Sequence, residues 1–176
     1  MNEERLAKVR TAARSEGIEI AVFDDSAMEE TAESVFEKEY REAGTYASYS
    51  REFMVYEGFT VEAVRSFSHT LKRYGIAFDG IRIRLGTENR KWSVKQLLET
   101  AEAEYETAVK LRVLQRLVQA AAMYLQKEAG GDTGKLRQYC QEAYAYLNGK
   151  EYEAGLTDLH CRRLSGQLRS LERTLH

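Results

Sequence analysis

The stretch SVKQLLETAEAEYETAVKLRVLQRLVQAAAMYLQK, residues 93–127, decides the fold of this chain. Its apolar residues recur every three or four positions, which is the spacing of one face of an α-helix. Ser93 followed by Gln96 has the spacing of a capping box, so the helix is expected to begin at Val94. At 1.5 Å per residue such a helix is about 50 Å long. It therefore either spans two subdomains or offers a face to a partner.

Two further helices are expected after this one. The first covers residues 135–147, because Asn148 and Gly149 supply a helix stop. The second covers residues 157–175, where five leucines form one stripe along the helix. The C-terminal half is therefore predicted to be an antiparallel three-helix bundle.

The N-terminal part is expected to mix helices with extended segments. Helices are predicted over residues 3–15, 27–42 and 61–74, and a strand over residues 18–23. The helix at residue 27 rests on the capping-box spacing of Ser26 and Glu29. The helix at residue 61 rests on Thr60, whose hydroxyl can accept a hydrogen bond from an unpaired amide. The pattern over residues 44–58 fits either a helix or an extended segment.

The sequence IAFDGIRIRL, residues 76–85, holds Asp79-Gly80 between alternating apolar residues. This dipeptide is the strongest short signal for a β-hairpin, because both turn positions need a positive φ. The apolar residues after the turn are expected on one face, and Arg82 and Arg84 on the other. The chain is thus predicted to be α+β and mainly α. An α/β subdomain with a short hairpin covers residues 1–92 and a helical bundle residues 93–176, with one continuous domain as the alternative.

The composition is that of a folded protein, with 43% apolar and 31% charged residues. No stretch approaches the ~18 uninterrupted apolar residues of a membrane span. The N-terminus MNEERLAKVR lacks the apolar core of a signal peptide. We therefore expect a cytoplasmic protein that does not enter a membrane, with Cys140 and Cys161 reduced.

No residue pattern supports catalysis, a metal site or a cofactor. The sequence GGDTGK, residues 130–135, departs from a phosphate-binding loop because its glycines stand one residue too close together. Cys140, His160 and Cys161 offer three zinc ligands without a CxxC pair, whereas a structural zinc site needs four ligands. The carboxylates stand in runs, which usually decorate solvated faces. The chain is accordingly predicted to be non-enzymatic.

The near-neutral total charge conceals two oppositely charged segments. Residues 16–42 hold ten acidic and two basic side chains, a net charge of −8, and residues 65–95 hold eight basic and two acidic side chains, a net charge of +6. Basic side chains around a tryptophan are typical of nucleic-acid contacts. The candidates are Arg65, Lys72, Arg73, Arg82, Arg84, Arg90, Lys91, Trp92 and Lys95. The alternative is that this patch pairs with the acidic segment inside the same molecule, which requires no external partner.

Tyrosine is abundant, with eleven residues. It is an interface residue because it combines a large apolar area with a polar tip. An acidic surface rich in tyrosine can mimic nucleic acid or fill a partner's groove. The protein-binding candidates are Tyr40, Tyr46, Tyr49, Tyr56, Glu29, Glu30, Glu33 and Glu37.

These features predict a protein-binding regulator or inhibitor whose partner is another protein or a ribonucleoprotein. Compact proteins encoded by phages and other mobile elements, anti-CRISPR inhibitors among them, often have this profile, so a host nucleic-acid-processing complex is the expected target. The alternative is a winged-helix-like transcriptional regulator that binds nucleic acid and forms a homodimer through its bundle. An enzyme whose glutamate, tyrosine and arginine side chains converge in a cleft is the third hypothesis.

Overall fold

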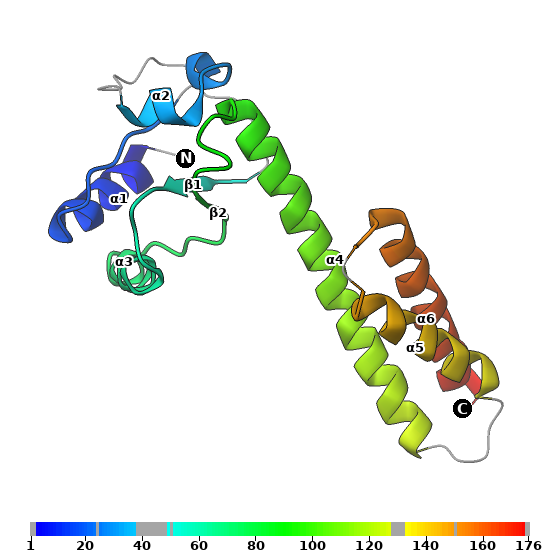
Figure 1. Cartoon of the computed structure of the whole chain (residues 1–176). Helices are drawn as coiled ribbons and strands as arrows, with labels where there is room; N and C mark the ends of the chain where they lie inside the picture. Colours follow the sequence, from blue (N-terminus) through cyan, green and yellow to red (C-terminus); the bar gives the residue numbers. More distant parts are fainter. Residues whose placement is uncertain are drawn as a thin grey trace. The chain divides into compact units, whose positions relative to one another are not determined.

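A computed structural model of the chain describes residues 3–23, 25–37, 49, 51–127, 133–149 and 151–174. The chain divides into two compact units, residues 1–102 and 103–176 (Figure 1). The division falls inside the long helix α4 (Val94–Lys127), which therefore belongs to both units. Within the described residues, no helix is both long and apolar enough to cross a membrane.

The first unit contains a parallel sheet of two strands, and a helix connects one strand to the other. Strand β1 (Phe53–Tyr56) leads into α3 (Val61–Arg73), which returns the chain to β2 (Ile81–Arg84). Phe53 pairs with Ile81 at the first position of both strands. The hairpin predicted at Asp79-Gly80 is therefore wrong. A tight turn joins only antiparallel strands, whereas a parallel pair needs a crossover such as α3.

Gly80 serves close packing and not a hairpin turn. A Cβ at this position would overlap the backbone carbonyl of Glu52, whose oxygen accepts a hydrogen bond of 2.9 Å from the Ile81 amide. Glycine thus lets the start of β2 approach the start of β1. The predicted alternation along β2 is confirmed, because its isoleucines are buried and Arg82 and Arg84 are exposed.

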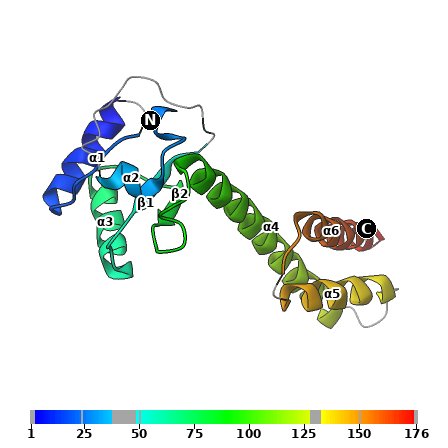
Figure 2. The same cartoon turned by 45° about the horizontal axis from the view of Figure 1, so that its top comes forward.

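Helix α1 (Glu3–Ser15) packs on α3, and the two lie side by side in Figure 2. Ala12 and Ala13 are fully buried in a cluster that includes Phe67 and Leu71 of α3. Small side chains at these two positions let the helix backbones approach each other. The predicted strand over residues 18–23 is wrong, because this segment has no strand structure. Ile18 and Ile20 instead pack against the α1–α3 cluster.

The cap predicted for α3 is confirmed. The Thr60 hydroxyl accepts a hydrogen bond of 3.2 Å from the Ala63 amide. After the helix, Gly75 takes a φ of +74°, a conformation that glycine adopts without strain. At the other end of the unit, the Arg5 guanidinium of α1 makes two bonds of 2.8 Å to the Glu52 carboxylate. This ion pair raises the pKa of Arg5 and ties α1 to the residue just before β1.

The helix of the acidic segment begins later than predicted. A 3-10 turn, η1 (Asp25–Ala27), precedes α2 (Ala32–Glu37), so the helix does not begin at residue 27. Thr31 and not Ser26 caps it, since the Thr31 hydroxyl accepts a hydrogen bond of 3.2 Å from the Ser34 amide. The backbone at Met28 and Glu30 instead accepts hydrogen bonds from the start of α4. Residues 38–42 of the predicted helix lie outside the described residues.

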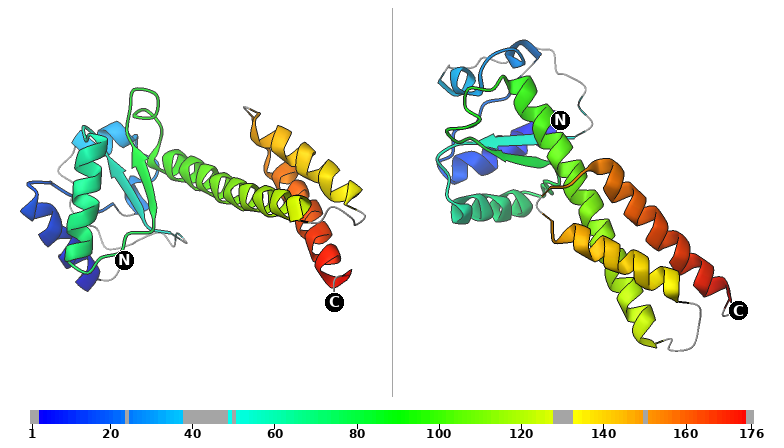
Figure 3. Two further views of the ribbon diagram at one scale, coloured as in Figure 1. Left: turned by 90° about the horizontal axis from the view of Figure 1, so that it is seen from below. Right: turned by 45° about the vertical axis from the view of Figure 1, so that its right-hand side comes forward.

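The second unit consists of α4 from residue 103 onward, α5 (Gly134–Leu147) and α6 (Ala154–Thr174). The predicted start of α4 is confirmed, because the Ser93 hydroxyl accepts a hydrogen bond of 3.1 Å from the Gln96 amide. In Figure 3, α5 and α6 lie beside the second half of α4. The three helices share one core of Leu114, Val118, Ala121, Leu136, Ala143 and Leu164. The chain is therefore mainly helical, with one small sheet.

Candidate interaction surfaces

Arg90 lies among three carboxylates of the first unit. Its Nη2 is 3.4 Å from Glu33 Oε1 and 3.9 Å from Glu37 Oε1, and both glutamates belong to α2. Its Nε is 3.1 Å from Glu57 Oε1, just after β1. This nitrogen is buried and is not aligned with that oxygen for a hydrogen bond, so the contact is an electrostatic one. One cation thus neutralises part of the charge of α2.

Backbone hydrogen bonds join the same two segments. Thr31 and Ser93 form an isolated antiparallel bridge. The Ala32 amide donates to the Trp92 carbonyl, and the Val94 amide donates to the Glu30 carbonyl, each at 2.9 Å. These bonds hold the start of α2 against the start of α4. Arg90 therefore pairs with the acidic segment inside the molecule, which is the alternative to nucleic-acid contact.

The other basic candidates lie on three elements. Arg65, Lys72 and Arg73 are on α3, Arg82 and Arg84 on β2, and Lys91 and Lys95 at the start of α4, and all seven are exposed. They make no ion pair with the part of the chain that the structure describes. The Arg82 guanidinium lies 4.8 Å from the ring centroid of Phe78. Trp92 is half-buried, which limits its use as a stacking platform.

The two described tyrosine candidates contribute to packing in the first unit. The Tyr49 ring meets Phe53 edge-on, with centroids 5.5 Å apart, and its hydroxyl donates to Met28 Sδ at 3.7 Å. Burial, with smaller contributions from nearby carboxylates, raises the pKa of Tyr49. The Tyr56 ring meets Phe59 edge-on with centroids 6.3 Å apart. Both side chains are thus partly used inside the fold.

The remaining protein-binding candidates differ in their surroundings. Tyr40 and Tyr46 lie outside the described residues. Glu29 is exposed, whereas Glu30 accepts a hydrogen bond of 3.1 Å from the Ser34 hydroxyl. Glu33 and Glu37 face Arg90, as described above. The predicted acidic surface is therefore partly neutralised within the first unit.

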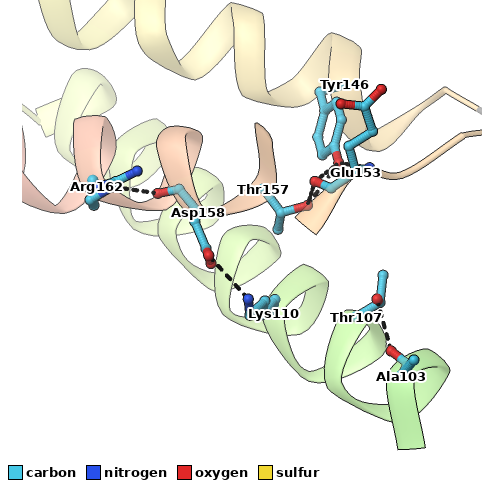
Figure 4. Close-up of polar contacts among 8 residues, drawn as sticks. All are labelled: Ala103, Thr107, Lys110, Tyr146, Glu153, Thr157, Asp158 and Arg162. Carbon is cyan, nitrogen blue, oxygen red and sulfur yellow. Dashed lines mark hydrogen bonds and ion pairs between the residues drawn. The ribbon is translucent and has the colours of Figure 1, made fainter. Parts of the chain in front are cut away.

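A hydrogen-bonded corner joins α5 to α6 in the second unit. Tyr146 Oη accepts a bond of 2.9 Å from the Glu153 amide and lies 2.7 Å from Thr157 Oγ1 (Figure 4). Thr157 is fully buried, so its hydroxyl needs these partners. Lys110 Nζ on α4 lies 3.0 Å from Asp158 Oδ2. The start of α6 is thereby attached to both other helices.

The histidine and cysteines considered as zinc ligands contribute to packing in the second unit. The His160 ring lies against Tyr146 with centroids 5.0 Å apart, and burial lowers the pKa of His160. Burial raises the pKa of Cys140 and of Cys161, which favours the protonated thiol over the thiolate. Among the described residues, no group of three or more His, Cys, Asp or Glu side chains is placed to hold a metal ion.

The outward face of α4 in the second unit carries exposed apolar side chains that the sequence analysis did not single out. Val109, Val113 and Met123 are 37%, 45% and 59% exposed, and Ala120 is exposed between the last two. Steps of four, seven and three residues place them on one side of the helix. That side differs from the one that holds Leu114 in the core. We call Val109, Val113, Ala120 and Met123 the α4 row.

A scan against protein-family models and searches of curated proteins and of solved structures found no match to this chain. The surfaces described above are therefore the basis for inferring a function. Of these, the α4 row is apolar and exposed, and the outer face of α3 is basic and without ion pairs to the described residues. Each predicts a different kind of partner.

Proposed function

We propose that this chain is a non-enzymatic protein-binding module that engages its partner through the α4 row. The observation that carries the proposal is the alignment of exposed apolar side chains along one face of α4. Apolar area gains free energy when a partner covers it, about 25 cal/mol per Å². Anchors spaced three, four and seven residues apart are also the usual means by which a helix docks on a partner.

The support of α4 within the second unit favours this use. Its inner side packs in the core shared with α5 and α6, and Lys110 is paired with Asp158 of α6. A helix that is already ordered loses little conformational entropy when it binds. The α4 row is therefore a preorganised surface.

The α4 row lies outside the acidic segment in which the sequence predicts the binding surface. Tyr49, Tyr56 and Glu33 are partly engaged inside the first unit, so less of their area is free for a partner. The regulatory or inhibitory role and the identity of the target complex remain predictions from the sequence.

The test is a Val113→Glu substitution, which places a charge in the α4 row. Tagged wild-type and variant proteins are used to capture partners from a nuclease-treated lysate. Gln115→Glu is the matched control, because it adds the same charge at another exposed position of α4. We expect Val113→Glu to capture at least about 10-fold less protein, because the partner would have to bury an unpaired charge. Equal capture by both variants would remove the α4 row from consideration.

A second candidate function is nucleic-acid binding by the outer face of α3. It is favoured by Arg65, Lys72 and Arg73, which are exposed and make no ion pair with the described residues. A winged-helix domain would use the predicted hairpin at residues 76–85 as its wing. That hairpin does not form, because β2 pairs in parallel with β1. Phosphate contacts from α3 alone remain the basis of this candidate.

Titration of labelled DNA and RNA at several salt concentrations tests this second function. Combined Lys72→Ala and Arg73→Ala should weaken binding and flatten its salt dependence by about two phosphate contacts. Lys127→Ala, an exposed lysine of the second unit, is the control. Absence of binding by the wild-type chain at low salt would reject nucleic-acid binding.

A further inference from the structure

We propose that the partner of the α4 row is a second copy of this chain, which pairs with it in antiparallel orientation about a two-fold axis. This inference rests on the proposed protein-binding function and names the partner. It starts from residues that extend the same face of α4. Glu106 precedes the row and Arg116 lies within it, and both are exposed.

The face has the spacing of a coiled-coil seam. The steps from residue 106 through 109, 113, 116, 120, 123 and 127 alternate between three and four, and all seven side chains are exposed. This alternation keeps one seam of a helix facing a partner helix over several turns. The α4 row is therefore the apolar part of a longer helical seam that has no partner within the described residues.

Residues 106–116 of the seam are self-complementary in one antiparallel register. When two copies are centred on residue 111, Val109 of each copy faces Val113 of the other. The same register places Glu106 of each copy opposite Arg116 of the other. A two-fold interface repeats each contact, so one dimer contains two central valine pairs and two ion pairs.

The charges decide between the two orientations. In a parallel, in-register pair, Glu106 would face Glu106 and Arg116 would face Arg116, and like charges at an interface are unfavourable. Neither side chain makes an ion pair with the described residues. The two stand ten positions apart on the helix, about 15 Å along its axis, so they cannot pair within one copy. Their complementarity is satisfied between antiparallel copies.

The dimer is expected to be weak and sensitive to salt. In this register Val109 and Val113 face each other, whereas Ala120 and Met123 lie opposite Glu102 and Glu99 of the other copy. The dimer therefore buries less apolar area than a permanent interface. A dissociation constant on the order of micromolar follows for so small an apolar centre with charged flanks. Raising the salt concentration screens the two exposed ion pairs and should weaken the dimer.

Sedimentation equilibrium of the full chain tests the register through charge reversal. Glu106→Arg alone, or Arg116→Glu alone, replaces both ion pairs of the dimer by like charges and should raise the dissociation constant at least about 10-fold. The double variant restores opposite charges and should return the constant to within about threefold of the wild type. Glu104→Arg, at an exposed position off the seam, is the control and should leave it unchanged. Circular dichroism verifies that each variant is folded.

Three outcomes overturn the inference. The first is a wild-type chain that is monomeric at about 200 µM. The second is a dimer that neither single reversal weakens, and the third is a double variant that fails to recover. If the chain is monomeric while Val113→Glu still abolishes capture of another protein, only self-pairing fails. If neither capture nor self-association depends on Val113, the proposed function fails as well.

Discussion

Replacing Arg90 by methionine tests whether its cation holds α2 against the start of α4. Methionine keeps an apolar stem of similar length and removes the guanidinium. Glu33, Glu37 and Glu57 then lose the cation that they share. We expect the first unit to become less stable, because three carboxylates gather around a position that no longer carries a positive charge.

The size of the effect follows from the exposure of the ion pairs. The Arg90 side chain is 34% exposed, those of Glu57 and Glu33 are 33% and 38% exposed, and that of Glu37 is 68% exposed. Solvent-screened pairs contribute ~0.2–1 kcal/mol each, and the Glu37 contact, the longest and most exposed, contributes least. The free energy of unfolding should therefore fall by about 1–2 kcal/mol. In 1 M salt, where the Debye length is about 3 Å, the deficit should shrink by about half.

Trp92 makes the assay specific for the first unit. It is the only tryptophan of the chain, and its carbonyl accepts a hydrogen bond from the Ala32 amide of α2. Urea unfolding followed by tryptophan fluorescence yields the free energy from the midpoint and the slope. Lys91→Met is the matched control, because Lys91 is exposed and makes no ion pair with the described residues. Equal midpoints for the two variants, or a deficit that 1 M salt leaves unchanged, would refute the reasoning.

Three further predictions concern other parts of the fold. Tyr146→Phe removes the hydroxyl that contacts Thr157, and urea unfolding followed by circular dichroism should show a loss of about 1–2 kcal/mol; wild-type stability would contradict a role for that hydroxyl. Burial lowers the pKa of His160 below its ordinary value of 6.5, so the unfolded chain takes up the proton first as the pH falls. The contribution of neutral His160 to stability should be complete above pH 6.5 and decline as the pH drops through the lower pKa of the folded state. His160→Phe should flatten that decline, as measured by the free energy of unfolding at several pH values. Gly80→Ala should cost about 1–3 kcal/mol because its Cβ overlaps a backbone carbonyl, whereas Gly86→Ala meets open space and should leave the fluorescence-detected midpoint nearly unchanged.

Local signals predicted the helices well. Ser93, Thr60 and Asn148 mark helix ends through bonds or conformations that involve only the adjacent turn, and all three lie at observed ends of α4, α3 and α5. Such signals act over three or four residues, so distant parts of the chain rarely override them. Ser26 is the exception, because the segment after it is held by the start of α4 and the helix begins later.

Strand direction could not be predicted from local residues. Asp79-Gly80 has the composition of a hairpin turn, but Ile81 pairs with Phe53, which lies before α3. The partner of a parallel strand is remote in sequence, and its identity depends on how the crossover helix packs. The strand prediction over residues 18–23 fails for a related reason, because Ile18 and Ile20 are buried against α1 and α3 and two alternate apolar residues resemble a strand.

The sequence by itself determined that the chain is mainly helical, where its longest helix begins and ends, and that its two charged segments have opposite sign. Only the tertiary structure decided that Arg90 faces Glu33 and Glu57, and which apolar residues of α4 remain exposed. Val118 is 8% exposed and Val113 is 45% exposed, although both are valines of the same helix. The periodicity of one helix shows that it has apolar faces. Which face is buried depends on the helices that pack against it, and that information lies in α5 and α6.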